Sequence, residues 1–141
     1  MLGSEKRENP QFFEEIGAIS GACIILDVDG TLRPDGDKDI SKVVLHKIEE
    51  LKRNNEVHIL SNKGSNKRKP WRSALGNLEI KSKNTIVIGD KFLTDGLFAK
   101  NIGSDFMMVR RKISGREPLF VKITYLIDNI AYKLWMAIKK Y

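Results

Sequence analysis

The sequence of 141 residues predicts an α/β fold built around a mainly parallel β-sheet. Short apolar runs alternate along the chain with segments of helical periodicity, which is the pattern of repeated βα units. The first run, residues 22–26, is uninterrupted and rich in β-branched side chains, as expected of a strand buried on both faces. The length is that of one domain, which we expect to span residues 1–141.

The composition is that of a globular protein in a reducing compartment. Hydrophobic residues make up 41% of the chain and charged residues 30%. Cys23 is the only cysteine, which excludes a disulfide scaffold within the chain. No apolar run reaches the ~18 residues of a membrane span, and the first ten residues lack the apolar core of a secretory signal. We therefore expect an intracellular protein, in the cytoplasm or an organelle matrix.

The N-terminal region is expected to contain a short helix, a strand and a loop. Residues 1–10 are polar, and we expect them to be loose. Apolar residues at helical spacing predict a helix that ends at Gly17 or Gly21; they are Phe12, Phe13, Ile16 and Ile19. The first strand, at 22–26, leads into a turn-rich loop at 33–39.

A helix, a strand and a second short helix are expected in the middle of the chain. Ser41 is a suitable N-cap for a helix that continues to Asn54. The apolar face of this helix is expected to consist of Val44, Leu45, Ile48 and Leu51. A strand follows at 57–60, and Pro70 suits the first turn of a short helix over 70–77.

Two more strands and two helices complete the expected fold. The strands are expected at 85–88 and 106–109, with a helix at 94–101 between them that stops near Gly103. The last helix, over 118–140, is amphipathic.

Three polar groups follow three of the expected strands. They are Asp27-Val28-Asp29-Gly30-Thr31, Ser61-Asn62, and Gly89-Asp90 with Thr94-Asp95. Any one of them alone could be an ordinary turn. Because ligands of parallel sheets bind outside the carboxyl ends of the strands, three such groups are expected to face one crevice.

The residue types of this crevice favour phosphoryl transfer. Asp27 and Asp29 are two residues apart, so in an extended chain they point the same way, and Asp90 would join them from a neighbouring strand. Hard oxygen ligands without thiols or imidazoles select Mg²⁺. His46 and His58 show no partner spacing; we expect His46 on a helix surface and His58 within a strand. A cation, a lysine and hydroxyl or amide donors together bind a phosphate and stabilise its transition state.

These residues resemble the motifs of the haloacid dehalogenase superfamily of phosphatases. The family pattern is Asp-x-Asp-Gly-Thr, then Ser or Thr, then Lys, then Gly-Asp-x-x-x-x-Asp. This chain matches it, in order, with Asp27 to Thr31, Ser61, Lys69, and Gly89-Asp90 through Asp95. The resemblance implies a Rossmann-like core in a three-layer sandwich.

The resemblance also implies a role for each matching residue. Asp27 would be the nucleophile that forms an aspartyl-phosphate, and Asp29 the general acid and base. The implied Mg²⁺ ligands are Asp27, the main-chain carbonyl of Asp29, and Asp90, with Asp95 in support. The implied phosphate-binding residues are Ser61, Asn62, Gly30, Thr31 and Lys69. Both Lys67 and Lys69 could be the lysine of the family pattern. We favour Lys69 because the closest subfamily carries Lys-Pro at this position, as Lys69-Pro70 does. We expect Lys67 and Arg68 in a solvated loop.

A closer similarity is to subfamily IIIA, the phosphatidylglycerophosphate phosphatases of bacteria and mitochondria. It runs from about residue 10 to 112 and is carried by residues 17–22, Ser61-Asn62, 87–95 and 101–103. Two features differ from the subfamily: Gly30 stands where Asn is usual, and only residues 63–68 separate Asn62 from Lys69. Relatives place a helix and a strand there, so this chain is expected to lack one αβ unit at the sheet edge.

The loop lengths bear on the substrate. Residues 32–40 and 63–68 are too short to form a cap domain, and a capless cleft suits a substrate that brings its own bulk, such as a macromolecule or a lipid headgroup. The subfamily resemblance favours phosphatidylglycerophosphate. The alternatives are a phosphatase of phosphoprotein or of nucleic-acid ends, and a non-catalytic lipid- or protein-binding module. Nucleic acid ranks lower because no zinc spacing, helix-turn-helix pattern or aromatic platform is evident.

The net charge of +7 and the last helix leave two interpretations open. Eight cations and two anions lie between Arg110 and Tyr141. An apolar stripe runs along the helix and consists of Leu119, Ile123, Leu126, Ile127, Ile130, Leu134 and Ile138. Tyr125, Tyr132 and Trp135 flank it. Either this helix covers one face of the sheet, or it lies on an anionic membrane as a basic, aromatic-edged interfacial helix.

Overall fold

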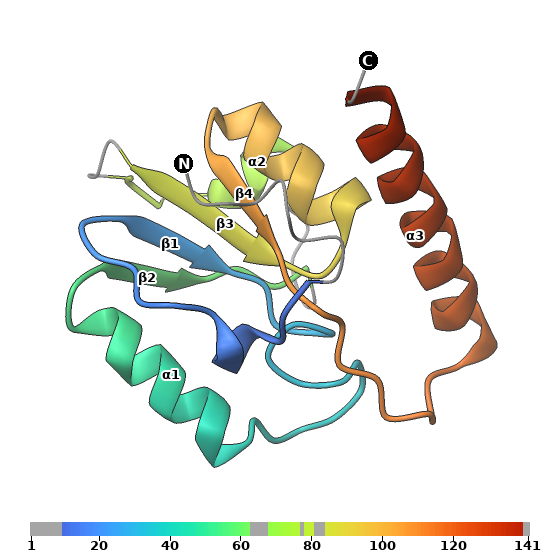
Figure 1. Cartoon of the computed structure of the whole chain (residues 1–141), viewed down its shortest axis with the longest axis horizontal. Helices are drawn as coiled ribbons and strands as arrows, with labels where there is room; N and C mark the ends of the chain where they lie inside the picture. Colours follow the sequence, from blue (N-terminus) through green and yellow to red (C-terminus); the bar gives the residue numbers. More distant parts are fainter. Residues whose placement is uncertain (1–9, 63–67, 77, 81–83, 140–141) are drawn as a thin grey trace.

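The computed structural model describes residues 10–62, 68–76, 78–80 and 84–139. Its centre is a sheet of four strands, all parallel, in the order β2-β1-β3-β4 (Figure 1). The strands are β1 (Cys23–Leu26), β2 (Glu56–Ile59), β3 (Thr85–Gly89) and β4 (Asp105–Met108). The expected α/β fold with a parallel sheet is confirmed, and the strands at 57–60 and 106–109 each begin one residue earlier than expected.

Two apolar layers cover the two faces of the sheet. Ile24 pairs in register with Ile86, and Ile25 with Val87, so in β1 and β3 side chains of equal parity share a face. The even-numbered side chains of β1 and β3 pack against α1 (Lys42–Lys52), and their odd-numbered side chains pack with Phe98 of α2 (Leu97–Ile102). This is the three-layer sandwich of a Rossmann-like fold.

Helix α1 follows the expected pattern at its start and differs on its apolar face. The Ser41 hydroxyl accepts a hydrogen bond from the Val44 amide at 3.4 Å, as an N-cap does. Val44, Ile48 and Leu51 are buried, but Leu45 is 45% exposed. The sheet therefore covers a narrower arc of the helix than the sequence pattern predicted.

Three expected helices are shorter or begin elsewhere. The N-terminal one is a single 3-10 turn, η2 (Phe13–Glu15), and the one at 70–77 is the short 3-10 helix η3 (Arg72–Leu75). The helix expected at 94–101 begins earlier, as the π-helical turn η4 (Phe92–Gly96) that continues into α2 and ends at Gly103 in the left-handed conformation (φ 72°). The early start has a long-range cause, because Asp128 accepts hydrogen bonds from the amides of Phe92 and Leu93, both at 2.8 Å.

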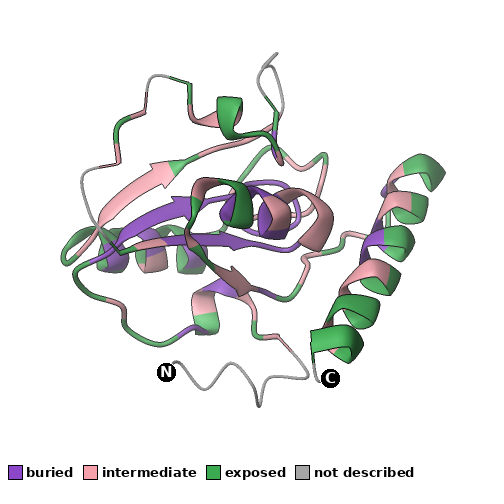
Figure 2. Ribbon diagram, turned by 90° about the horizontal axis from the view of Figure 1, so that it is seen from above, coloured by how far each residue is buried: buried purple, intermediate pink, exposed green. Residues whose placement is uncertain are grey.

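The last helix, α3 (Leu119–Lys139), covers neither face of the sheet. Of the helices and strands that the structure describes, it contacts η4 alone, and it stands apart from the sandwich in Figure 1. Tyr125 and Asp128 are the buried residues among those described in this helix, whereas the residues of the apolar stripe are exposed. Figure 2 shows that most of the α3 ribbon is exposed or half-buried. The interpretation of this helix as a cover for the sheet is wrong, because polar contacts at Asp128 fix its orientation.

The described connections agree with a trimmed and capless core. β2 pairs only with β1 among the described strands, and the described residues between Asn62 and β3 contain η3 but no strand. Residues 34–40 contain neither helix nor strand. No helix of the described residues has the length and apolarity to cross a membrane.

Candidate active site

Four side chains from distant parts of the chain meet at the carboxyl ends of β1 and β3. The Lys69 ammonium lies 2.7 Å from an oxygen of Asp27 and 2.7 Å from an oxygen of Asp95. Asp27, Asp90 and Asp95 each present a carboxylate oxygen, and these three oxygens lie within 4.8 Å of one another. All four side chains are nearly or fully buried, from 9% exposed at Asp27 to 0% at Asp95. The expected convergence of these residues is therefore what the structure shows.

Thr31 contacts two of the three carboxylates. Its buried hydroxyl is 2.9 Å from an Asp90 oxygen and 3.3 Å from an Asp27 oxygen, and it can donate to either one. Thr31 is expected among the phosphate-binding residues, but it is 0% exposed, and its hydroxyl contacts the Asp27 and Asp90 carboxylates.

Gly30 allows the close approach of Asp90. Gly30 has a φ of +84°, and a Cβ at this position would lie 2.4 Å from the Asp90 Oδ2 atom. The resemblance placed Gly30 among the phosphate-binding residues, where relatives carry Asn. In this chain the absence of a side chain is what lets the loop after β1 pack on Asp90.

We expect Gly30→Ala to disturb the site, and Gly36→Ala to serve as its matched control. Gly36 also has a positive φ, of +89°, but a Cβ there meets nothing within 4 Å. Left-handed strain of about 1 kcal/mol is common to both variants. The contact with Asp90 should add about 1–3 kcal/mol to the loss of unfolding free energy in Gly30→Ala alone. Urea denaturation measures the difference, and equal losses in the two variants would contradict the close packing.

Arg111 is a residue of this site that the sequence analysis counted only within the basic tail. Its Nε lies 2.8 Å from Asp90 Oδ2, and its Nη2 donates to the Asp90 carbonyl at 3.0 Å. It also lies 3.6 Å from Asp128 and stacks 4.0 Å from the centre of the Tyr125 ring. Arg111 therefore joins α3 to the acidic cluster. No local sequence motif identifies Arg111, because Asp90 and Asp128, to which its side chain is bound, lie 21 and 17 residues away along the chain.

Burial and mutual repulsion govern the ionisation of the acidic cluster. Burial, together with the negative charge of Asp27, raises the pKa of Asp90 to about 6, although Arg111 opposes the shift. Burial and the Asp27 charge also raise the pKa of Asp95 well above its ordinary value. For Lys69, burial lowers the pKa, but the charges of Asp95 and Asp27 more than offset it and raise the pKa. Lys69 is therefore a cation whose charge balances only part of the cluster.

The acidic cluster fits a divalent cation. Asp27, Asp90 and Asp95 offer three hard oxygen atoms within 4.8 Å of one another. The raised pKa values of Asp90 and Asp95 reflect burial and the nearby Asp27 charge, and a cation would offset both effects. These three carboxylates are the groups that could hold it, and the resemblance adds the main-chain carbonyl of Asp29. The identity of the cation as Mg²⁺ is part of the proposal below.

This electrostatic arrangement predicts how metal and pH act on stability. Because the folded-state pKa of Asp90, about 6, exceeds its ordinary value of 3.8, the metal-free folded state holds a proton that the unfolded state has lost. Its unfolding free energy should therefore fall as the pH rises from about 4 to about 6, by up to about 3 kcal/mol. Mg²⁺ competes with that proton, so it should raise the melting temperature more above pH 6 than below it.

Thermal melts with and without Mg²⁺ across this pH range measure the effect, and Asp90→Asn is the control. This variant removes the titrating group, so the pH dependence of the Mg²⁺ shift should flatten. If Mg²⁺ raises the melting temperature of the unaltered protein equally at the low and the high end of this pH range, the proposed cation site is contradicted.

A small cleft opens above the buried cluster. It is lined by Asp27, Asp29, Asp35, Ser61, Asn62, Lys91 and Thr94, and its volume is about 90 Å³. Pockets that enclose a whole small-molecule ligand are larger, roughly 300–1,000 Å³. This cleft therefore has room for a compact group such as a phosphate, with the rest of a substrate outside it.

The other expected site residues lie at this cleft or beside it. Asn62 accepts a hydrogen bond from the Lys69 amide at 3.0 Å, which fixes the segment that carries the lysine. Asp29 is 8% exposed and lies 3.6 Å from Arg33. Arg68 is exposed, as expected, and Lys67 lies outside the described residues. Lys91, a cleft residue that the sequence analysis did not single out, lies one position after Asp90 in the matched motif.

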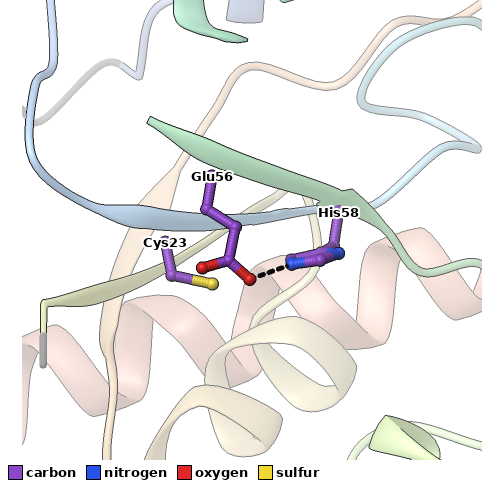
Figure 3. A group of neighbouring side chains, drawn as sticks. All are labelled: Cys23, Glu56 and His58. Carbon is purple, nitrogen blue, oxygen red and sulfur yellow. Dashed lines mark hydrogen bonds and ion pairs between the residues drawn. The ribbon is translucent and has the colours of Figure 1, made fainter. Parts of the chain in front are cut away.

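A second group of metal-ligand residue types lies on β1 and β2, away from this cleft. Cys23, Glu56 and His58 face one another across the two strands, as Figure 3 shows. The Glu56 carboxylate and the His58 ring are 2.5 Å apart, so His58 has a partner two residues away that the sequence analysis did not recognise. The Glu56 carboxylate and the His58 ring therefore already contact each other in this group.

Comparison with known protein families gives a match to part of the chain. A family model described as HAD-hydrolase-like matches residues 67–132, a segment that contains Lys69, Asp90, Asp95 and Arg111. The searches of curated proteins and of solved structures find no match. The matched segment is slightly less than half of the chain, and both this match and the parallel α/β sandwich agree with the resemblance to hydrolases of the haloacid dehalogenase superfamily.

Proposed function

We propose that this protein is a Mg²⁺-dependent phosphomonoesterase that works through an aspartyl-phosphate, and that its substrate is phosphatidylglycerophosphate. The observation that carries the proposal is Asp27. Its carboxylate lines the cleft, contacts the Lys69 ammonium at 2.7 Å, and lies beside two further carboxylates that could share a cation. A carboxylate so placed can meet a phosphate that enters the cleft.

In the first step, an Asp27 oxygen attacks phosphorus and the bond from phosphorus to the ester oxygen breaks. Asp29 lines the same cleft and gives its proton to the departing oxygen. In the second step, Asp29 takes a proton from a water whose oxygen attacks phosphorus. The bond from phosphorus to Asp27 then breaks, and inorganic phosphate leaves.

The surrounding residues supply positioning and charge. Lys69 holds Asp27 in place and adds positive charge near the transferring group, with Ser61 and Asn62 at the cleft wall to bind phosphate oxygens. A bound Mg²⁺ would supply further positive charge to the phosphate oxygens in the transition state. Arg111 holds Asp90 for that cation.

The size of the cleft supports the choice of substrate. A space of about 90 Å³ admits a terminal phosphate, and no cap closes over it in the described residues. A substrate that is anchored by its own bulk needs no such cap. The resemblance of the sequence motifs to subfamily IIIA favours a lipid headgroup over other bulky phosphomonoesters.

Phosphate release from a panel of substrates tests the proposal. The panel holds phosphatidylglycerophosphate in detergent, a phosphopeptide and a 3′-phosphorylated oligonucleotide, each with and without Mg²⁺, and Asp27→Asn is the blank. We expect Mg²⁺-dependent release, fastest from the lipid. Faster release from the peptide or the oligonucleotide would contradict the assignment of phosphatidylglycerophosphate as the substrate. If no substrate releases phosphate, the protein is not a phosphomonoesterase, and a non-catalytic binding module is favoured.

A further inference from the structure

The outer surface of α3 is apolar and exposed along its length. The members of the apolar stripe are between 47% exposed, at Ile123, and 73% exposed, at Leu119. Phe120, beside the start of the stripe, is 75% exposed. Scattered exposed apolar residues are common, but a continuous row of this kind marks an interaction surface.

The fold does not need this stripe, because the opposite face of α3 makes the contacts with the rest of the protein. Asp128 holds the Phe92 and Leu93 amides, and the Phe92 ring lies 5.9 Å from that of Tyr132 and 5.6 Å from that of Trp135. The apolar stripe therefore takes no part in the packing of α3 against the described residues of the protein, and its exposure needs another explanation.

The charges beside the stripe identify what would cover it. The one carboxylate of α3, Asp128, is buried at 3% exposure, whereas Lys122, Lys133 and Lys139 are exposed. Lys122 precedes Leu126 by four residues and Lys133 follows Ile130 by three, so both lysines adjoin the stripe on the helix surface. A second copy of the chain on this face would bring lysines against lysines. An anionic lipid surface offers hydrocarbon to the stripe and negative charge to the lysines.

We propose that α3 lies in the surface of an anionic bilayer, with the apolar stripe toward the acyl chains and its lysines among the headgroups. The strand arrowheads in Figure 1 point toward the side on which α3 stands, so this contact would be made at the end of the molecule that holds the cleft. Binding of this kind requires no turnover, so the inference does not depend on the proposed function.

Vesicle co-sedimentation of the full chain tests the proposal. Vesicles of phosphatidylcholine alone are compared with vesicles of equal parts phosphatidylcholine and phosphatidylglycerol, and binding is expected only to the second kind. The double variant Ile123→Gln, Ile130→Gln should weaken binding by about tenfold or more, since two half-inserted side chains lose their apolar contact. Lys122→Gln and Lys133→Gln should each weaken it by about fivefold, the equivalent of about 1 kcal/mol per cation.

The matched control makes the same chemical change on another helix. Val43 and Leu45 are exposed apolar residues of α1, at 63% and 45%, and Val43→Gln with Leu45→Gln should leave vesicle binding unchanged. Circular dichroism of every variant checks that the fold is intact. Asp27→Asn should bind vesicles as the unaltered protein does, so a loss of activity and a loss of binding remain separate results.

Three results would overturn the proposal. The first is equal binding, or no binding, to the two kinds of vesicle. The second is an equal loss of binding in the α1 control variant. The third is a lipid-free dimer that the stripe variant converts to a monomer, since a second copy would then be the occupant. None of these results would affect phosphate release measured in detergent.

Discussion

Asp27→Asn should abolish phosphate release while the protein stays folded. The amide keeps the shape of the side chain but is a far weaker nucleophile than the carboxylate, so the attack on phosphorus fails. We expect kcat to fall by roughly a thousandfold or more. Lys69 keeps its contact with Asp95 at 2.7 Å, and one negative charge leaves a crowded acidic cluster, so folding should not suffer. Phosphate release under saturating substrate and a thermal melt measure the two effects.

Asp35→Asn is the matched control for this experiment. Asp35 lines the same cleft but is not among the three carboxylates that could share a cation. The same change of a carboxylate to an amide should therefore reduce kcat by less than about tenfold. Near-normal turnover by Asp27→Asn would show that Asp27 is not the nucleophile, and it would contradict the proposed mechanism.

Lys69→Met should cause the largest loss of stability among single substitutions in the site. The ammonium is buried and lies 2.7 Å from both Asp27 and Asp95, so its removal leaves two buried carboxylates without their cation. Breaking a buried ion pair in this way costs about 3–5 kcal/mol of unfolding free energy. Activity should be lost as well, because Asp27 loses the group that holds it. Urea denaturation in the absence of metal measures the stability.

The neighbouring residue supplies the control for this loss. Arg68→Met removes an exposed cation from the preceding position and should change the unfolding free energy by no more than about 0.5 kcal/mol. Adding Mg²⁺ should restore part of the stability of Lys69→Met, because a divalent cation neutralises the same carboxylates. If Lys69→Met and Arg68→Met unfold at the same urea concentration, Lys69 does not hold the cluster together.

Local patterns were sufficient to predict the parallel sandwich. The apolar run at β1 and the alternation of strands and helices are visible in short stretches of sequence. Each pattern shows which side chains of one element are buried, and it extends over only a few neighbouring residues. The positions of Asp27 and Asp90 could be predicted too, since the residues after parallel strands must gather at one edge. The Ser41 N-cap is local in the same sense, because its partner is three residues away.

Other features depend on contacts that no short segment contains. Asp128 sets the start of η4 from 35 residues away, and Arg111 reaches back 21 residues to Asp90. The same contacts turn the polar face of α3 inward, so the apolar stripe, which the sequence shows plainly, lies outside rather than on the sheet. The sequence by itself determined which residues α3 could bury. Only the tertiary structure decided which of them it does bury, because hydrogen bonds to a buried carboxylate are directional, whereas apolar contact is not.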